Sequence, residues 1–436
     1  FSFFFLFVLR GNTQEVEILT LEDCLRIGID NNLSLEGKRK EIQKSKYGVS
    51  ENRSKLLPQI NAIAGYNNNF DPPVSVTDGS SYGVPYNITK TLQHSANAGL
   101  EMQMPLFNQT LYTSMSIAKV MEEISRLSYG KAREDVILQI SKMYYLGQVT
   151  AEQIMLIKAN ITRLEELRDI TQAFFDNGMS MEVDLKRVNI NLENLKVQYD
   201  NAQAMMKQQL NMLKYIMDYP AEKEIALTPV NADSITTVAL TGLSENIYEL
   251  QLSQSQVQLA ERQKKIITNG YIPSLSLTGS WRYAAYTDKG YHWFHSGPSN
   301  QWFRSYGVGL TLRIPIFDGL DKTYKIKKAM IDIENKRLAW EDARKNLQTQ
   351  YLNAVNDLMN NQRNFKKQKD NYLLAEDVYA VTSDRYREGI ASMTEVLQDE
   401  MQMSEAQNNY ISAHYNYRVT NLMLLKLTGQ IESLVK

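Results

Sequence analysis

Two uninterrupted helical patterns, each about 70 residues long, limit the folds open to this chain. They run from Phe107 to Gly178 and from Phe317 to Gly389, and in the second an apolar or aromatic residue returns every seven positions. At 1.5 Å per residue, each helix would be on the order of 100 Å long. A globular domain cannot enclose such a helix, and a sustained heptad is typical of coiled-coil packing. The low counts of glycine (21) and proline (10) among 436 residues agree with long helices.

The features that flank these helices occur twice, in the same order. An aliphatic residue followed by proline stands at 57–58 and again at 272–273, and the glycines that end the two helices, Gly178 and Gly389, are 211 positions apart. Such self-similarity indicates an internal duplication. Each repeat is expected to contain an opening helix, a β-hairpin and a long helical hairpin whose tip lies near its glycine. The predicted divisions are a tail at 1–18, a first repeat at 19–220, a linker at 221–243 and a second repeat at 244–436.

The residues after each proline alternate between apolar and polar, which predicts strands with one apolar face. We expect one β-hairpin at about 57–107 and another at about 272–317. The loops within them, 71–93 and 287–301, are rich in Gly, Pro, Ser, Asn and aromatic residues. The polar strand faces carry Glu101, Gln103, Thr311 and Arg313.

Four amphipathic strands have two open edges, and unpaired backbone groups cost several kcal/mol each in hydrocarbon. Copies from other chains must therefore complete the sheet in a membrane, and three chains would supply twelve strands around a wet lumen. The predicted fold class is an internally duplicated α+β membrane protein. It combines a four-stranded contribution to a trimeric 12-stranded β-barrel with a long antiparallel α-helical coiled-coil barrel. A soluble β-sandwich would explain the strands but not the helices attached to them.

Composition argues against several other functions. The net charge of −1 does not suit a nucleic-acid binder, and a single cysteine rules out an internal disulfide framework. No catalytic triad order, P-loop or dinucleotide-binding glycine motif is present, so we expect no enzyme and no cofactor. His292 and His295 have the spacing of metal ligands, but aromatic loop packing is the favoured interpretation; a bearing on metal export stays open. His94 and His414 are interpreted as structural residues.

The start of the chain suggests export. Residues Phe1 to Leu9 are almost wholly apolar but too few to cross a bilayer as a helix. We interpret them as the remnant of a signal peptide. Cys24 could be a lipidation site in an exported protein, but it lies well past the apolar run, within a stretch of helical spacing capped by Thr20 and Asp23. A small buried helix residue is the favoured interpretation of Cys24.

The order of these motifs resembles the TolC-like family of outer membrane efflux proteins. None of the motifs is specific alone, whereas their repetition in the same order is, and the resemblance covers nearly the whole chain after the tail. The residues that carry it are the opening segment 19–25 with Asn31 and Asn32, the strand entries 57–58 and 272–273, the strand exits 105–108 and 315–319, and the tip turns 174–185 and 385–397.

The resemblance implies a homotrimeric channel in the outer membrane of a Gram-negative bacterium, extending into the periplasm. Such a channel is a passive duct for drugs and small molecules, or for proteins. Its expected partners are outer membrane lipid, a periplasmic adaptor and an inner-membrane pump of RND or ABC type. The implied adaptor-docking residues at the tips are Phe175, Gly178, Tyr386 and Gly389.

The resemblance also implies a periplasmic gate of carboxylates at Asp184 and Glu395. The family often carries a basic residue two positions after the second tip glycine. That position is Ala391 here, which brings the usual salt-bridge latch into question.

A soluble periplasmic coiled-coil scaffold or adaptor is the alternative function. Adaptors usually carry one helical hairpin beside segments rich in Gly, Val and Thr. In this chain the hairpin occurs twice and that composition is missing. Cell fractionation separates the two hypotheses, because a scaffold would be released with the soluble periplasm.

Overall fold

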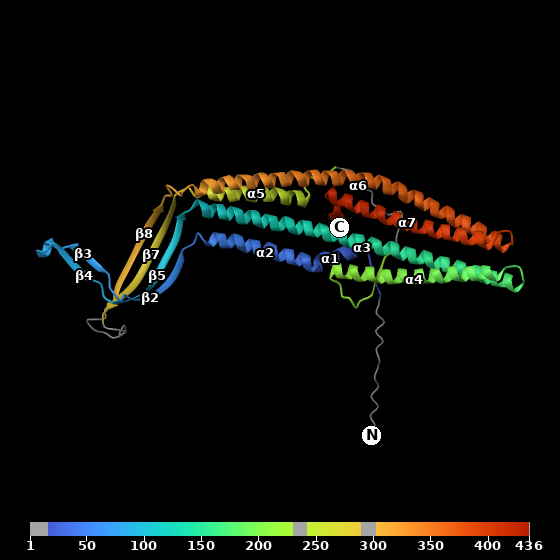
Figure 1. Ribbon diagram of the computed structural model, residues 1–436, viewed down its shortest axis with the longest axis horizontal. Helices are drawn as coiled ribbons and strands as arrows, with labels where there is room; N and C mark the ends of the chain where they lie inside the picture. Colours follow the sequence, from blue (N-terminus) through green and yellow to red (C-terminus); the bar gives the residue numbers. More distant parts are fainter. Residues whose placement is uncertain (1–15, 230–241, 289–301, 436) are drawn as a thin grey trace, which may run out of the picture. The chain divides into compact units, whose positions relative to one another are not determined.

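The computed structural model describes residues 16–229, 242–288 and 302–435, which divide into two compact units. Both of the predicted long helices are present and contribute to both units: α3 is Gln109–Asp176 and α6 is Asp321–Arg387 (Figure 1). We call the units the sheet unit and the tip unit. The sheet unit is made of residues 42–125 and 254–338, and the tip unit of the described residues within 1–41, 126–253 and 339–436.

The sheet unit contains one antiparallel sheet of four strands, built from the two predicted β-hairpins. The strand order is β2-β5-β7-β8, so the two repeats join through β5 and β7. Among the described residues, β2 and β8 each have one edge without a strand partner. The strands are β2 (Gln59–Asn68), β5 (His94–Phe107), β7 (Ser274–Thr287) and β8 (Trp302–Arg313).

The segment between β2 and β5 holds a second hairpin, where the sequence indicated only a long loop. Its strands are β3 (Val74–Asp78) and β4 (Tyr86–Lys90), joined through a short 3₁₀ turn at Ser80–Tyr82. Five-residue strands flanked by proline, glycine and serine give too short an alternation to stand out from a loop. The described part of the predicted loop 287–301 is limited to 287–288.

The opening helix that the sequence predicted for the first repeat is divided into two helices. The observed helices are α1 (Leu21–Asn31) and α2 (Leu33–Ser54). The backbone of Asn32 leaves the helical conformation, with ψ 118°, and its side chain forms hydrogen bonds with two backbone groups. Its Oδ1 accepts from the Leu35 amide at 3.1 Å and its Nδ2 donates to the carbonyl of Ile216 at 2.7 Å. This tertiary contact explains a break that the helical pattern alone did not predict.

The predicted cap of the first helix is present. Thr20 and Asp23 form a reciprocal capping box at the start of α1. Cys24, one turn further, is fully buried in a core with Leu25, Ile137 and Leu213. Burial raises the pKa of its thiol to about 12, which makes the side chain a small packing residue.

The remaining helices carry the second arm of each helical hairpin. They are α4 (Glu182–Met217) and α7 (Met393–Leu427), and α5 (Tyr248–Asn269) opens the second repeat. Two short strands, β1 (Glu17–Leu19) and β6 (Ile225–Leu227), pair in parallel. No helix within the described residues has an apolar stretch long enough to cross a membrane.

Candidate functional site

The strand register gathers the predicted polar residues on one face of the sheet. Asn61, Glu101, Ser280 and Gly307 lie opposite one another in a row across all four strands. Gln103, Thr278 and Gly309 form the next row, Thr311 pairs with Ser276, and Arg313 pairs with Ser274. A groove of about 520 Å³ follows the first two rows, so this polar face is hollowed. One polar face of the sheet therefore carries all four predicted residues, Glu101, Gln103, Thr311 and Arg313.

An ion pair crosses this face. The guanidinium Nη2 of Arg282 donates to Oε1 of Glu101 at 2.6 Å, and both side chains are a little under half exposed. Arg282 was not among the polar strand residues named from the sequence. Glu101 and Arg282 stand diagonally across β5 and β7, so only the register brings them together. The pair places one anionic and one cationic group on the polar face.

The opposite face of the sheet is apolar and exposed. Val308 is 80% exposed, Leu310 66% and Ile60 65%. Aromatic side chains on the same face include Tyr66, Trp281 and Tyr306. Large apolar surfaces on a folded protein mark contact with lipid or another protein. A sheet with one polar and one apolar exposed face is suited to separate lipid from water.

The tips of the two helical hairpins have the same backbone. Gly178 and Gly389 both adopt φ +74°, the left-handed region that glycine reaches without strain. The Gly178 amide donates to the carbonyl of Phe175 at 2.9 Å, and the Gly389 amide donates to that of Tyr386 at the same distance. The next amide donates five residues back at 2.8 Å in both tips. Each helix therefore ends in a Schellman turn.

The side chains at the two tips differ. Phe175 is 38% exposed, whereas Tyr386 is only 6% exposed. The Tyr386 ring lies 5.7 Å from the ring of Phe174, and its hydroxyl donates to Thr171 Oγ1 at 3.3 Å. Tyr386 thus holds the two tips together, and its ring is largely buried within the single chain. Its contact with an adaptor stays a prediction. A groove of about 700 Å³ lies between the tips, lined by both glycines.

The two candidate gate carboxylates occupy the first turns of the returning helices. Asp184 lies 3.5 Å from Arg187, whose Nη1 also donates to Thr394 Oγ1 at 3.2 Å in the other tip. Glu395 forms a capping box with Ser392, accepting from the Ser392 amide at 3.1 Å. Ala391 packs against the apolar tip core. Arg187 therefore adds a polar link between the tips, whereas Ala391, two residues after Gly389, contributes apolar packing.

A buried polar cluster between α3 and α7 was not expected from the sequence. Arg418 Nε donates to His414 Nε2 at 2.9 Å, and Tyr410 donates to Glu152 Oε1 at 2.9 Å. His414 is fully buried, with Nδ1 3.4 Å from Glu152 Oε2. Burial opposes the charge on Glu152, but its hydrogen bonds to His414 and Tyr410 leave its pKa below the ordinary value. Periodicity along a helix does not show which polar residues turn inward, so the sequence did not indicate this cluster.

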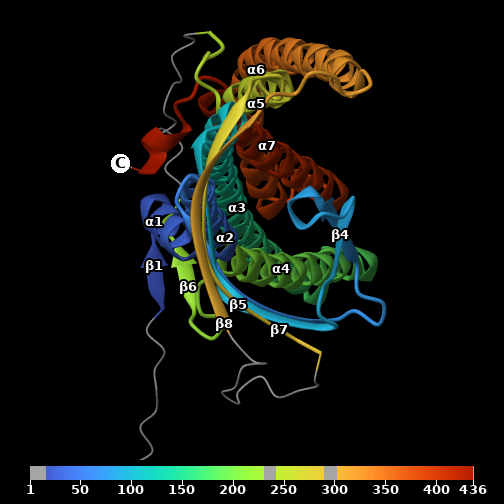
Figure 2. The ribbon, with the colours of Figure 1, turned by 90° about the vertical axis from the view of Figure 1, so that its left-hand side faces the viewer.

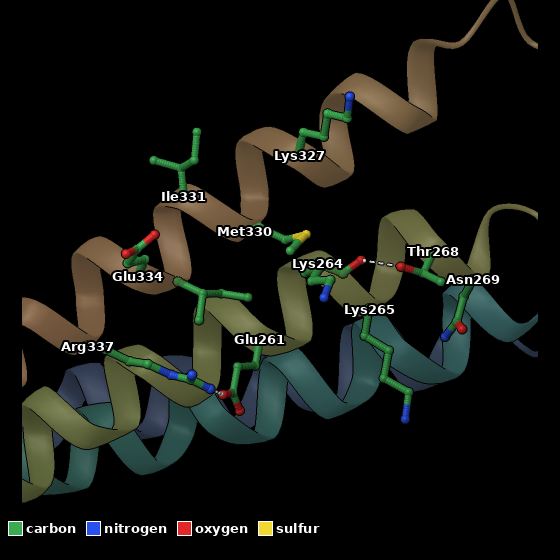
Figure 3. Close-up of a pocket in the computed structure, with 11 residues that line it drawn as sticks. Glu261, Lys264, Lys265, Thr268, Asn269, Lys327, Met330, Ile331, Glu334 and Arg337 are labelled. Atoms are coloured by element: carbon green, nitrogen blue, oxygen red, sulfur yellow. Dashed lines mark hydrogen bonds and ion pairs between the residues drawn. The ribbon is translucent and has the colours of Figure 1, made fainter.

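A second groove, of about 970 Å³, separates α5 from α6 in the sheet unit (Figure 3). Arg337 Nη2 on α6 donates to Glu261 Oε1 on α5 at 2.8 Å, which bridges the two helices at one end of the groove. Met330 is 53% exposed and Ile331 60%. These helices are therefore only partly covered by the chain's own elements.

Two predictions fall on residues outside the described part of the chain. They are the spacing of His292 and His295 and the signal-peptide interpretation of Phe1 to Leu9. Most of the predicted linker, from 230 to 241, also lies outside it.

Comparison with known proteins extends over almost the whole chain. The family described as outer membrane efflux protein matches residues 27–217 and 241–430. The outer membrane protein TolC of Vibrio cholerae is 21% identical over 396 residues, 88% of this chain and 84% of TolC. The probable efflux pump outer membrane protein TtgC of Pseudomonas putida is 23% identical over 379 residues, 82% of this chain and 75% of TtgC. The open-state structure of the Neisseria gonorrhoeae MtrE outer membrane channel has a TM-score of 0.74 at 18% identity, and covers 94% of this chain and 88% of MtrE.

Proposed function

The chain belongs to the outer membrane efflux protein family, and from this membership we propose a homotrimeric duct that exports small molecules with a periplasmic adaptor and an inner-membrane pump. The family resemblance seen in the sequence is confirmed, and with it the assignment to outer membrane efflux channels over a soluble scaffold. The repeats 19–220 and 244–436 are the proposed duplicated units. The open edges of the sheet are the observation that supports the trimer.

Within the described residues, β2 and β8 both present an edge without a strand partner, and open edges are excluded from hydrocarbon, so a single copy of the sheet is not suited to a membrane. Pairing β8 of one copy with β2 of the next satisfies both edges. Three copies joined in this way close a barrel of twelve strands, which is wide enough to leave a lumen. The apolar face, with Val308 and Leu310, then meets lipid, and the polar face with Glu101, Gln103, Thr311 and Arg313 lines the duct.

The same closure supports the helical part of the proposal. Since α2 precedes β2 and α6 follows β8, the copy that pairs with the sheet edge is also adjacent to these helices. Their exposed side chains include Tyr47 on α2 and Ile331 on α6.

We place the adaptor contact at the tip groove, with Phe175, Gly178 and Gly389 at the surface. Asp184 and Glu395 are the proposed gate carboxylates near it. The pump is of RND or ABC type.

Conductance measurement tests the duct directly. The purified protein is expected to migrate as a trimer in mild detergent and to form ion-conducting pores in planar lipid bilayers. A monomer that is released with soluble periplasmic proteins and does not conduct would contradict the proposal.

A deletion strain should become more sensitive to exported drugs and regain resistance on complementation. Complementation by Phe175→Asp should fail if the tip surface docks an adaptor, although this variant should still conduct in bilayers.

Ion selectivity tests whether Glu101 and Arg282 line the lumen. Because the two charges neutralise each other, Glu101→Gln should shift the reversal potential in a salt gradient toward anion selectivity. Arg282→Gln should shift it toward cations. Gln103→Asn, on the same strand and face but uncharged, is the control and should leave selectivity unchanged. Identical reversal potentials in all variants would remove Glu101 and Arg282 from the lumen.

A further inference from the structure

The hairpin β3–β4 carries an apolar face that no described residue covers. Val76 lies opposite Ile88, and Asp78 lies opposite Tyr86, so alternate residues share each side. Val76 is 61% exposed, and Tyr86 and Ile88 are 67% exposed. The other side of the hairpin is polar and consists of Ser75, Thr77, Asn87 and Thr89. The apolar face also carries one charged residue at each end, Asp78 opposite Tyr86 and Lys90 opposite Val74. Its centre, Val76 and Ile88, is wholly apolar, and a ribbon with such a centre is suited to have one face covered.

The hairpin is tied firmly to the end of the main sheet. The Asn69 amide donates to the carbonyl of Gln93 at 2.8 Å, which continues the pairing of β2 with β5. The Gln93 amide donates to Oδ1 of Asp288, directly after β7, at 2.6 Å. At the far end, Asp78 Oδ1 accepts from the Ser80 amide at 2.9 Å and shapes the turn. The first two bonds therefore fix both ends of the segment that carries the hairpin to the end of the sheet.

The position is at the end of the sheet remote from the helices. The helices join the sheet where β2 begins and β5 ends, and the hairpin arises where β2 ends and β5 begins. Figure 2 looks toward this end and shows the four strands as an arc, with β3–β4 on its inner side. The groove along Glu101 and Ser280 shows that the hollow side of the sheet is the polar one. The hairpin therefore stands over the side of the sheet that would face a lumen.

A two-stranded hairpin is at best marginally stable in water unless its apolar face is covered. A second copy of this chain is the occupant that the structure favours. β2, from which the hairpin arises, is one of the two edge strands that require a neighbouring copy. Three-fold closure would also bring three identical apolar faces toward one axis.

We propose that the β3–β4 hairpins of three copies pack together through Val74, Val76, Tyr86 and Ile88 and narrow the outer mouth of the duct. This inference rests on the proposed trimeric channel. The apolar faces cover one another, and the polar faces with Thr77 point to water. The mouth opens only when the hairpins separate.

Cysteine cross-linking tests this contact, because Cys24, the single cysteine, is fully buried. Val76→Cys should give disulfide-linked dimers within the purified trimer under mild oxidation. Thr77→Cys is the matched control, next in sequence but on the opposite face, and should give none. Oxidised Val76→Cys pores should conduct at least twofold less than after reduction, and Val76→Asp with Ile88→Asp should conduct at least twofold more than the unaltered protein.

The outcomes separate this inference from the proposed function. Trimers that conduct but show no Val76→Cys cross-link, or cross-link equally through Thr77→Cys, would overturn the hairpin contact and leave the duct intact. If a partner from outside the cell covers this face instead, the trimers should conduct and show no Val76→Cys cross-link. If no trimer forms and no pore conducts, the proposed function itself fails.

Discussion

The two helical tips have one backbone and two sets of side chains. Both turn at a glycine with φ +74° and make the same pair of backbone hydrogen bonds. Yet Tyr386 is buried where Phe175 is exposed, and Ser392 caps α7 where Met181 leaves α4 without a side-chain cap. Duplication has kept the turn that the chain path requires. The side chains differ in that the ring of one tip, Tyr386, is buried against the other tip.

The largest expected difference between the tips comes from their aromatic residues. Tyr386→Ala removes a buried ring from between the tips and should lower the free energy of unfolding by about 3–5 kcal/mol. Phe175→Ala, the equivalent change in the exposed position, should cost less than about 1 kcal/mol. Thermal unfolding of the detergent-solubilised protein, followed by helical circular dichroism, measures both. Equal losses would mean that both rings are buried in the assembled protein.

The repeats also differ in a buried carboxyl group. Burial raises the pKa of Glu134 from 4.5 to about 7, whereas the position 211 residues later is the exposed Lys345. A carboxyl group with a higher pKa when folded binds more protons in the folded state. The contribution of the Glu134 carboxyl group to the free energy of unfolding is therefore most favourable below about pH 4.5, and it is lost as the pH rises through 7.

Glu134→Gln should flatten this pH dependence, with a gain at pH 8 of at most roughly 3 kcal/mol in unfolding free energy. Unfolding at several pH values between 4.5 and 8 measures the slope. Glu123→Gln, an exposed carboxyl group on the same helix, is the control. An unchanged slope in Glu134→Gln would show that this carboxyl group is ionised in the folded protein.

Because the two tips share one backbone conformation, replacing either glycine with alanine should lower the free energy of unfolding by the same amount. Gly178→Ala and Gly389→Ala should each cost about 1–2 kcal/mol, since the added methyl group meets no atom within 4 Å and only the positive φ opposes it. Gly37→Ala, in the exposed part of α2, should instead stabilise by about 0.5–1 kcal/mol. Unequal costs at the two tips would refute the backbone equivalence.

The smallest effect concerns the helix caps. Ser392→Ala removes the capping box of α7 and should cost about 1 kcal/mol. Met181→Ser places a serine three residues before Asp184 and should transfer the box to α4, with a gain of about 0.5–1 kcal/mol. The same unfolding assay compares them. A loss in Met181→Ser would mean that the Met181 side chain already has a covering partner in the assembly.

Much of the fold could be predicted from local patterns. Uninterrupted helical patterns predicted α3 and α6, alternation predicted the four long strands, and glycines marked both tips. These features depend on periods of two or about 3.6 residues and on the special freedom of glycine, which are properties of short segments. The polar strand face with Glu101 and Arg313 followed from the same alternation.

Other features depended on segments far apart in the chain. The break at Asn32 needs the carbonyl of Ile216, the burial of Tyr386 needs Phe174 and Thr171, and the Glu101–Arg282 pair needs the register of β5 with β7. Periodicity shows which residues share a face. It does not show what covers that face, because the cover comes from another part of the chain or from another copy.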